Sequence, residues 1–314
     1  MAADGHGALR DVGDAVSRAC DKRVVSCVPL TRCGGYTRAL RAVATFADGS
    51  TAFVKAATES DTAEWIRREI GVYETLGAQP FQPGYYGSAY RAETGFPVLV
   101  LEDLTGAYWG PPWRGGDVEK VRDMLAAVRP CAALFADGFL PSQDADRAGL
   151  ASWDKVAADP EPFLSLGFCS RAWLEGALPI LLHADATAPL DGDDLVHQDV
   201  RSDNLCFTDD GRAVLVDWNW ACYGNGTVDI AGWLPSLHHE GGPAPEAILP
   251  DQPELAAILA GYWAARAGRP SPDFDTAGRI RRLQKLQLSV AFPWAVRALG
   301  LPDFLTARTP SSPR

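Results

Sequence analysis

The segment from His197 to Asp217 constrains the fold more than any other part of the chain. It reads HQDVRSDNLCFTDDGRAVLVD, in which two short apolar runs flank Thr-Asp-Asp-Gly, a turn signal typical of a β-hairpin. A hairpin folds its two ends together. We therefore expect Asn204 and Asp217, which are thirteen residues apart, to lie close in space.

Three polar side chains of this segment have the chemistry that phosphoryl transfer uses. Asp199 can accept a proton from an attacking hydroxyl group, while Asn204 and Asp217 offer the kind of oxygen atom that Mg²⁺ prefers. Taken singly, each residue has a plain structural interpretation: His197 as a packed histidine, Asp199 as a cap, and Asp217 as a turn residue at a strand end. The joint spacing favours a phosphoryl-transfer site.

Length and composition indicate a soluble globular protein. The chain has 314 residues, 47% of them apolar and 22% charged, which is enough for one large or two medium domains. No stretch approaches the roughly 18 consecutive apolar residues of a membrane-spanning helix, and the N-terminus lacks the basic-then-apolar order of a signal peptide. We therefore expect a cytoplasmic protein without a membrane partner.

The seven cysteines do not form a metal-binding or disulfide pattern. Their number is odd and no two of them form a C-x-x-C pair. We therefore expect reduced thiols that pack as small apolar side chains, with no zinc site and no redox chemistry.

The net charge of −11 is unevenly distributed, with −2 in residues 1–104 and −9 in residues 105–314. A negative surface disfavours nucleic acid as a partner and attracts cationic small molecules. An acidic chain is equally common for solubility alone, so both interpretations stay open.

Apolar periodicity predicts a strand-rich first part of the chain. A helix is expected at about 8–21, five strands at 24–30, 39–46, 51–56, 85–91 and 97–101, and an amphipathic helix at 61–76. Residues 31–37 and 47–50 have the Gly and Asp content of hairpin turns. Five antiparallel strands and the one amphipathic helix then form a compact first lobe.

Beyond Glu102-Asp103-Leu104 the pattern changes to helices. They are expected at about 117–137, 144–158, 170–184, 244–267 and 273–299, interrupted by the hairpin. This change predicts an α+β fold with a first lobe at residues 1–103 and a larger, mostly helical lobe at residues 104–314.

The order of these signals resembles a known family. A glycine turn, a strand lysine, a helix glutamate, an apolar strand ending in Glu-Asp-Leu, the pattern H-x-D-x-x-x-x-N and a strand-borne Asp-Trp follow one another along residues 24–300. This order is similar to that of the aminoglycoside phosphotransferase and choline kinase family, itself similar to protein kinases. The resemblance implies a bilobal protein-kinase-like fold and a small-molecule kinase that uses Mg²⁺ and either ATP or GTP.

The strand lysine and its partner are the first residues to which the resemblance gives roles. Lys55 lies in the apolar run Thr-Ala-Phe-Val-Lys-Ala, where an inward lysine needs an anionic partner such as a phosphate group. The family pattern implies that Glu69 pairs with Lys55, with Glu64 and Glu74 as competing candidates. Without the downstream motif, a solvated lysine and a surface glutamate would be the default.

Two further segments are candidates for nucleotide binding. Gly34 and Gly35 would let the main chain approach phosphate groups, although a Gly-Gly pair is also an ordinary turn. The resemblance implies that Glu102, Asp103 and Leu104 form the hinge between the lobes, where main-chain groups contact the base. The choice between ATP and GTP stays open.

In the catalytic loop the resemblance implies that Asp199 is the base and that Asn204 and Asp217 bind the metal. The order H-Q-D-V-R-S-D-N is closer to the H-R-D-L-K-P-E-N of protein kinases than to relatives that have Gly after the histidine and a second His after the aspartate. Arg201 stands at the position of the catalytic-loop lysine.

Arg201 has two possible roles. A guanidinium group there can stabilise charge on the transferred phosphoryl group, or it can form a structural ion pair with Asp203 or Asp229. His197 is expected to order the loop, and Asp229 resembles the family's helix-start aspartate that braces it.

The acceptor site is expected in the second lobe. Its candidate residues are aromatic or lie beside a carboxylate, which suits a ring-bearing or cationic acceptor: Trp218, Trp220, His238, His239, Glu240 and the segment Tyr108–Trp113. For any single tryptophan, an ordinary place in the core is the alternative.

These observations favour phosphorylation of an aminoglycoside-like compound or another antibiotic, as in a resistance kinase. A metabolic kinase for choline, sugars, homoserine or methylthioribose is the alternative. A catalytically inactive binding module is disfavoured because Lys55, Asp199, Asn204 and Asp217 are all present. A protein substrate is disfavoured because no activation-loop-like insert follows Asp217, and oligomeric state cannot be predicted.

Overall fold

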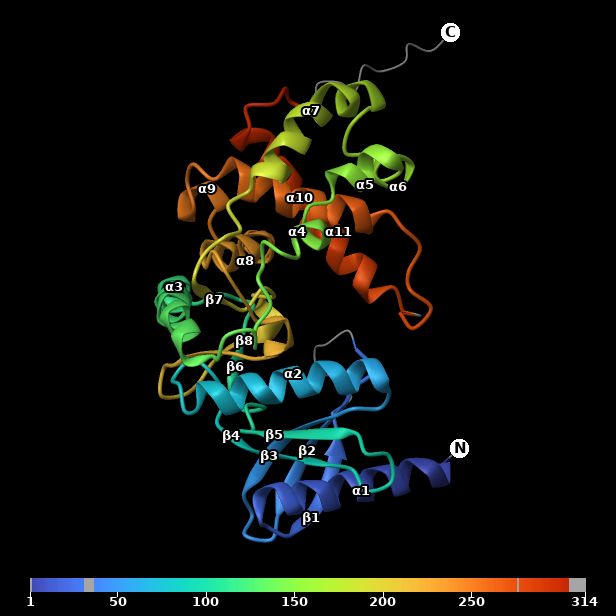
Figure 1. Ribbon diagram of the computed structural model, residues 1–314, viewed down its shortest axis with the longest axis vertical. Coiled ribbons are helices and arrows are strands. Elements are labelled where there is room, and N and C mark those ends of the chain that lie inside the picture. The colour runs from blue at the N-terminus through green and yellow to red at the C-terminus, as the bar shows by residue number, and fades with distance from the viewer. Residues whose placement is uncertain (1, 31–36, 276, 305–314) are drawn as a thin grey trace. The chain divides into compact units, whose positions relative to one another are not determined.

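The computed structural model describes residues 2–30, 37–275 and 277–304 and has an α+β fold (Figure 1). The chain divides into two compact units. The first comprises residues 1–110, 115–139 and 202–221, and the second comprises residues 111–114, 140–201 and 222–314. Within the described part of the chain, no helix is long and apolar enough to cross a membrane.

A five-stranded sheet forms the centre of the first unit. Its strands are β1 (Val24–Pro29), β2 (Leu40–Phe46), β3 (Thr51–Ala56), β4 (Tyr85–Tyr90) and β5 (Pro97–Leu101). They are arranged in the order β1-β2-β3-β5-β4, and every pairing is antiparallel. The predicted five-stranded antiparallel sheet is confirmed.

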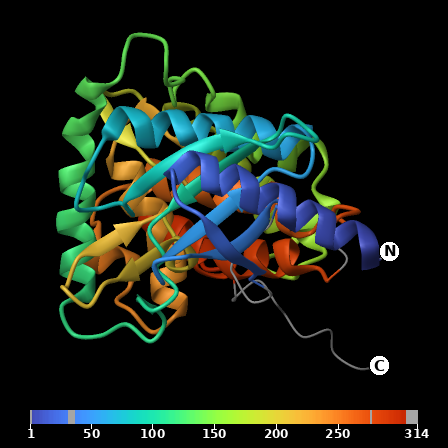
Figure 2. The same ribbon diagram turned by 90° about the horizontal axis from the view of Figure 1, so that it is seen from below.

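Two helices pack against this sheet, and they correspond to the helices expected at about 8–21 and 61–76. In both views α1 (Ala2–Cys20) and α2 (Ser60–Leu76) lie on opposite faces of the strands (Figures 1 and 2). The small side chains of the strands bury Val12 and Val16 of α1 in a common apolar core. The sequence analysis counted only the second helix as part of the compact lobe, and the apolar stripe of α1 adds the first.

Strand β3 separates the two faces by simple alternation of its side chains. Val54 and Ala56 belong to the core beneath α1, whereas Phe53 and Lys55 point to the other face and line a cavity. The turn at 47–50 sets the register of β2 and β3, with the N–H of Phe46 donating to the carbonyl of Ser50 at 2.8 Å.

The predicted hairpin is present and belongs to the first unit. Strands β8 (Leu205–Phe207) and β9 (Ala213–Leu215) are antiparallel, and β6 (Tyr108–Trp109) adds a third strand that was not expected. Helix α3 (Asp117–Val128) and the short 3₁₀ helices η1 (Arg129–Leu134), η2 (Ser202–Asn204) and η3 (Trp218–Trp220) complete the unit. The first compact unit therefore includes residues on both sides of the expected lobe boundary at 103/104. The division into lobes at that boundary stays a prediction.

The second unit is mostly helical, as expected. It contains α4 (Arg147–Leu150), α5 (Trp153–Ala158), α6 (Glu161–Leu164), α7 (Arg171–Thr187), α8 (Thr227–His239), α9 (Pro245–Ile248), α10 (Pro253–Ala267), α11 (Arg279–Ala298) and an antiparallel pair, β7 (Asp194–Val196) and β10 (Cys222–Gly224). Two predicted helices, 144–158 and 244–267, are each divided into two. Apolar periodicity did not predict helix α8, which contains Gly232 and Pro235, two residues that disfavour helix, although the resemblance implied a helix start at Asp229.

Candidate active site

A cavity of about 600 Å³ lies in the first unit, a size typical of small-molecule sites. Part of its wall is apolar and includes Leu30, Phe53, Leu101, Leu104 and Val216. Another part is polar and includes Lys55, Glu69, Asn204 and Asp217. An apolar wall next to a cation and several oxygen atoms suits a ligand with a flat ring and an anionic end.

Lys55 connects two carboxylates at the polar end of this cavity. Its Nζ lies 2.6 Å from Glu69 Oε2 and 2.5 Å from Asp217 Oδ1. Glu69, on α2, is the candidate glutamate that reaches the lysine. Glu64 is exposed, and Glu74 accepts a hydrogen bond from the hydroxyl of Tyr85 at 2.8 Å.

The charges in this cluster depend on one another. Burial disfavours the ammonium form of Lys55, but the carboxylates of Asp217 and Glu69 outweigh burial and raise the pKa of Lys55 above its usual value. Burial also raises the pKa of Glu69, and the charge of Lys55 is the main opposing effect. Lys55 therefore stays a cation at neutral pH.

The hairpin brings Asn204 and Asp217 to the same cavity. The N–H of Val216 donates to the carbonyl of Asn204 at 3.0 Å, which fixes the two ends of the hairpin side by side. The described residues contain no group of three or more His, Cys, Asp or Glu side chains suited to a metal. One amide and one carboxylate oxygen nevertheless fit Mg²⁺, because Mg²⁺ commonly takes one or two carboxylates and completes its shell with phosphate groups and water.

The expected hinge residues lie in two environments. Glu102 and Leu104 line the cavity, whereas Asp103 accepts hydrogen bonds from the N–H and the hydroxyl of Thr105, at 3.0 and 2.7 Å. Burial works against its ionisation, but these hydrogen bonds lower the pKa of Asp103. Asp103 therefore caps a turn. Gly34 and Gly35 lie outside the described residues.

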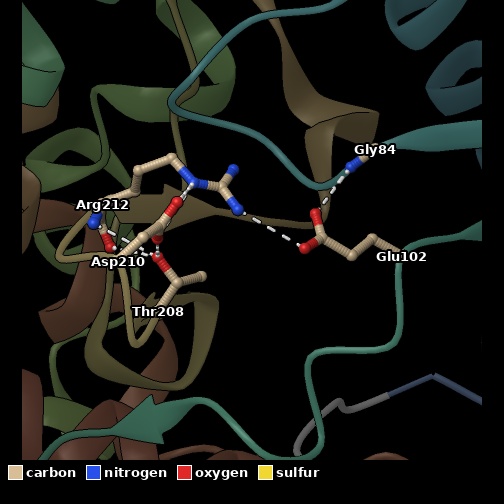
Figure 3. Close-up of polar contacts among 5 residues, drawn as sticks. All are labelled: Gly84, Glu102, Thr208, Asp210 and Arg212. Atoms are coloured by element: carbon tan, nitrogen blue, oxygen red, sulfur yellow. Dashed lines mark hydrogen bonds and ion pairs between the residues drawn. The ribbon is translucent and has the colours of Figure 1, made fainter.

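A network of polar side chains holds Glu102 at the rim of the cavity (Figure 3). Its Oε2 accepts the N–H of Gly84 at 3.0 Å, and its Oε1 lies 3.4 Å from Arg212 Nη2. Arg212 in turn forms an ion pair of 2.9 Å with Asp210, which also accepts a hydrogen bond from Thr208. This rim network links the segment after β5 to the turn of the hairpin.

In the second unit the loop that carries Asp199 is held by buried side chains. The carboxylate of Asp229 accepts the N–H groups of His197 and Gln198, both at 2.7 Å. The Nδ1 atom of His197 then accepts the N–H of Asp199 at 3.2 Å. Arg201 forms an ion pair with Asp199, a partner that the sequence analysis did not consider for it.

Several of the residues expected at the acceptor site belong to the first unit, namely Trp218, Trp220 and residues 108–110. Trp218 is fully buried, packs on Phe81 with ring centres 5.9 Å apart, and donates its indole N–H to the carbonyl of Leu215. The apolar interior therefore encloses the whole ring, and its place at an acceptor site stays a prediction. Trp220 is 46% exposed, with its ring centre 6.3 Å from that of Trp65.

Four of the expected acceptor residues, Trp113, His238, His239 and Glu240, gather at the end of α8 in the second unit. Glu240 accepts the indole N–H of Trp113 at 2.9 Å, and the Trp113 ring packs edge-on against Trp233. His238 and His239 are exposed. This arrangement brings part of the aromatic insertion next to a carboxylate and two imidazole groups.

Asn219 is a buried polar residue that the sequence analysis passed over. When its amide is oriented so that both ends have hydrogen-bond partners, its nitrogen donates to Asp217 Oδ1 at 2.8 Å and its oxygen accepts the indole N–H of Trp220 at 3.2 Å. A signal was present, because Asn219 is a polar residue between two tryptophans and two positions after the proposed metal ligand. Sequence spacing alone does not show that its side chain turns back to Asp217.

Comparison with known proteins adds a family and a set of related folds. The sequence pattern described as "Phosphotransferase enzyme family" matches residues 37–272. The GDP and kanamycin complex of APH(2")-IIia has a TM-score of 0.56 and 12% identity, covering 91% of this chain and 97% of that chain. Macrolide 2'-phosphotransferase type I has a TM-score of 0.50 and 17% identity, covering 98% and 96%.

A thermostable mutant of aminoglycoside phosphotransferase APH(4)-Ia, in ternary complex with AMP-PNP and hygromycin B, has a TM-score of 0.56 and 12% identity, covering 93% of this chain and 98% of that chain. At these identities the solved structures show a shared fold. No curated protein sequence matches the chain.

Proposed function

Because the chain belongs to the phosphotransferase enzyme family, we propose that it transfers the γ-phosphate of ATP or GTP to a hydroxyl group of a small molecule. The observation that carries this proposal is one cavity that joins an apolar wall to Lys55, Asn204 and Asp217. Related folds that hold GDP with kanamycin, or AMP-PNP with hygromycin B, support a nucleotide donor and a small-molecule acceptor.

The cavity suits a purine nucleotide. The apolar wall accepts the base, next to the main chain of Glu102 and Leu104. The ammonium group of Lys55 contacts the phosphate groups, and its ion pair with Glu69 fixes its direction. Main-chain contacts of this kind can serve either adenine or guanine, so both nucleotides belong in the test.

Asn204 and Asp217 would hold Mg²⁺, which neutralises charge on the phosphate oxygens when it is bound. Their contribution is to fix the site: Asn204 is 5% exposed, and the carboxylate of Asp217 is already oriented by Lys55. Positioning of this kind supplies most of the rate in phosphoryl transfer.

Asp199 would act as the general base. The acceptor hydroxyl oxygen forms a bond to the γ-phosphorus, the bond from this phosphorus to the bridging oxygen of the nucleoside diphosphate breaks, and the hydroxyl proton passes to Asp199. Asp199 lies five residues before Asn204 in a continuous chain. The ion pair with Arg201 orients the carboxylate, while His197 and Asp229 support the loop.

We place the acceptor at the end of α8. Glu240 and the indole ring of Trp113 offer a carboxylate and an aromatic surface, which together favour an amino-bearing hydroxyl compound such as an aminoglycoside. The excess of negative charge in residues 105–314 agrees with a cationic acceptor. A metabolic acceptor such as choline, a sugar, homoserine or methylthioribose is the alternative.

The test is release of nucleoside diphosphate from Mg·ATP and Mg·GTP with a panel of aminoglycosides, macrolides, amino alcohols and sugars. Asp199→Asn should lower acceptor-dependent turnover by roughly 10²–10⁴-fold, the usual contribution of a general base, while nucleotide binding persists. Asp209→Asn makes the same chemical change at an exposed position of the hairpin turn and is the matched control.

If Asp199→Asn turns over as fast as the control variant, Asp199 is not the general base. Tight nucleotide binding without turnover of any acceptor would count against the proposed acceptor class. Glu240→Gln adds a further readout, because it should raise the KM of an amino-bearing acceptor and leave the KM of the nucleotide unchanged.

A further inference from the structure

We propose that Asn219 is a positioning residue that fixes the backbone and the carboxylate of Asp217 for binding the metal–nucleotide complex. This inference rests on the proposed function, in which Asp217 is a metal ligand. It assigns a task to a side chain that neither the family match nor the sequence pattern singles out.

Asp217 has an unusual backbone conformation that needs support. Its φ and ψ angles of 71° and 57° lie in the left-handed region, which is unfavourable for a residue with a side chain. The amide nitrogen of Asn219 lies 3.2 Å from the carbonyl oxygen of Asp217 and 2.8 Å from its Oδ1. A single side chain therefore holds both the main chain and the carboxylate of the strained residue.

The amide of Asn219 is itself held. It is 6% exposed, and its oxygen accepts the indole N–H of Trp220 at 3.2 Å. These partners fix which end of the amide faces Asp217, because the reversed amide would direct its oxygen at acceptors and its nitrogen at a donor. The Trp220 ring in turn lies against Trp65, with ring centres 6.3 Å apart.

These contacts form a closed ring that begins and ends on α2. Trp65 precedes Glu69 by one helical turn, so both project from the same side of α2. One path runs from Trp65 through Trp220 and Asn219 to Asp217. The other runs from Glu69 through Lys55 to the same oxygen of Asp217.

The chemistry of the two donors is complementary. Lys55 Nζ and the Asn219 amide both contact Oδ1 of Asp217, at 2.5 and 2.8 Å. Lys55 supplies a positive charge, whereas the neutral amide of Asn219 orients the carboxylate of Asp217 without changing the charge of the site. An aspartate at position 219 would replace the donor by a second carboxylate and repel Asp217.

The test measures the Mg²⁺ dependence of nucleotide binding by fluorescence of a labelled ADP, in wild type, Asn219→Ala and Trp220→Phe. Asn219→Ala should raise the half-saturating Mg²⁺ concentration by about 10–100-fold, as is usual when a residue that orients a metal ligand is removed. Binding of the same nucleotide without Mg²⁺ should change less than threefold.

Trp220→Phe keeps an aromatic ring against Trp65 and removes the N–H that anchors Asn219, so it should give a smaller shift in the same direction. It also carries the test if Asn219→Ala does not fold. Asn225→Ala is the matched control, because the amide of Asn225 also makes two hydrogen bonds, to Pro189 and from Thr227. Its Mg²⁺ dependence should equal that of wild type.

A Mg²⁺ dependence of both variants within twofold of wild type would overturn the inference. Equal losses of affinity with and without Mg²⁺ would overturn it too, since they would indicate a general structural role of the loop. Failure of the proposed function is a different result: the wild type would then show no Mg²⁺-dependent nucleotide binding.

Discussion

Two groups of charged residues in the first unit, both built around carboxylate–cation pairs, differ in their access to water. In the cluster of Lys55, Glu69 and Asp217, the first two side chains are 8% and 1% exposed. In the rim network, Arg212 and Glu102 are 32% and 28% exposed. The same kind of contact therefore occurs once in a nearly dry setting and once beside solvent.

The difference in exposure predicts how much each charge pair contributes to the stability of the fold. Removing one partner of a buried pair leaves the other charged and poorly solvated, which costs several kcal/mol. At an exposed pair, water replaces the lost partner and little free energy changes. The buried cluster should therefore determine the geometry of the cavity, and the rim network should tolerate change.

The largest effect should come from Lys55→Met. It leaves Glu69 and Asp217 without the cation between them, so we expect a loss of about 3–5 kcal/mol in the free energy of unfolding, measured by urea denaturation at neutral pH. Lys22→Met is the matched control, because Lys22 pairs with Asp48 in an exposed position.

The control should leave the unfolding midpoint almost unchanged. Adding Glu69→Leu to Lys55→Met should recover part of the stability, because the stranded carboxylate is then gone. Equal losses from the two lysine substitutions would contradict the comparison.

An intermediate effect on stability should come from Asp185, a buried carboxylate that has, among the described residues, no cation beside it comparable to Lys55. Asp185, on α7, is 3% exposed and accepts the N–H of Trp153 at 3.0 Å, and burial raises its pKa to about 6. Between about pH 4 and pH 6 the folded protein holds a proton that the unfolded chain has released, so stability falls as pH rises through this range.

The size of this loss should be on the order of 2–3 kcal/mol, since each unit of pKa shift corresponds to about 1.4 kcal/mol. Asp185→Asn retains an acceptor for Trp153 and should flatten the pH dependence of unfolding between about pH 4 and 7. An unchanged slope in the variant would assign the pH dependence to other groups.

The smallest effect should come from the rim. Arg212→Gln removes the ion pairs to Glu102 and Asp210, and we expect less than about 1 kcal/mol of lost stability because both partners stay hydrated. The effect should shrink further at 1 M salt, where exposed charges are screened. A loss comparable to that of Lys55→Met would show that the rim is as constrained as the buried cluster.

The sequence predicted those parts of the site that depend on local pattern. The apolar run of residues 51–56 placed Lys55 on a strand, and the turn signal after Phe207 predicted the hairpin that brings Asn204 to Asp217. Both features follow from the backbone of a few neighbouring residues. They did not require knowledge of contacts distant in sequence.

The features that were missed depend on distant contacts. The burial of Trp218, for which a place in the core was the alternative, depends on Phe81, far away in the chain. The role of Asn219 depends on its side chain turning back to Asp217, and helix α8 forms despite Gly232 and Pro235 because its side chains are largely buried. Propensity and spacing do not contain this information, since tertiary packing overrides both.

The alternation of β3 has a consequence for the length of the turn that precedes it. If one residue were inserted between positions 47 and 50 and β3 slipped by one place, Val54 would face the cavity and Lys55 would enter the apolar core beneath α1. The turn is exposed, so Ala47 is free to vary, whereas Gly49 is constrained by its φ of 84° and Asp48 by the hydrogen bond that it accepts from the N–H of Ser50. Insertion or deletion of a residue there should be less tolerated than substitution of Ala47.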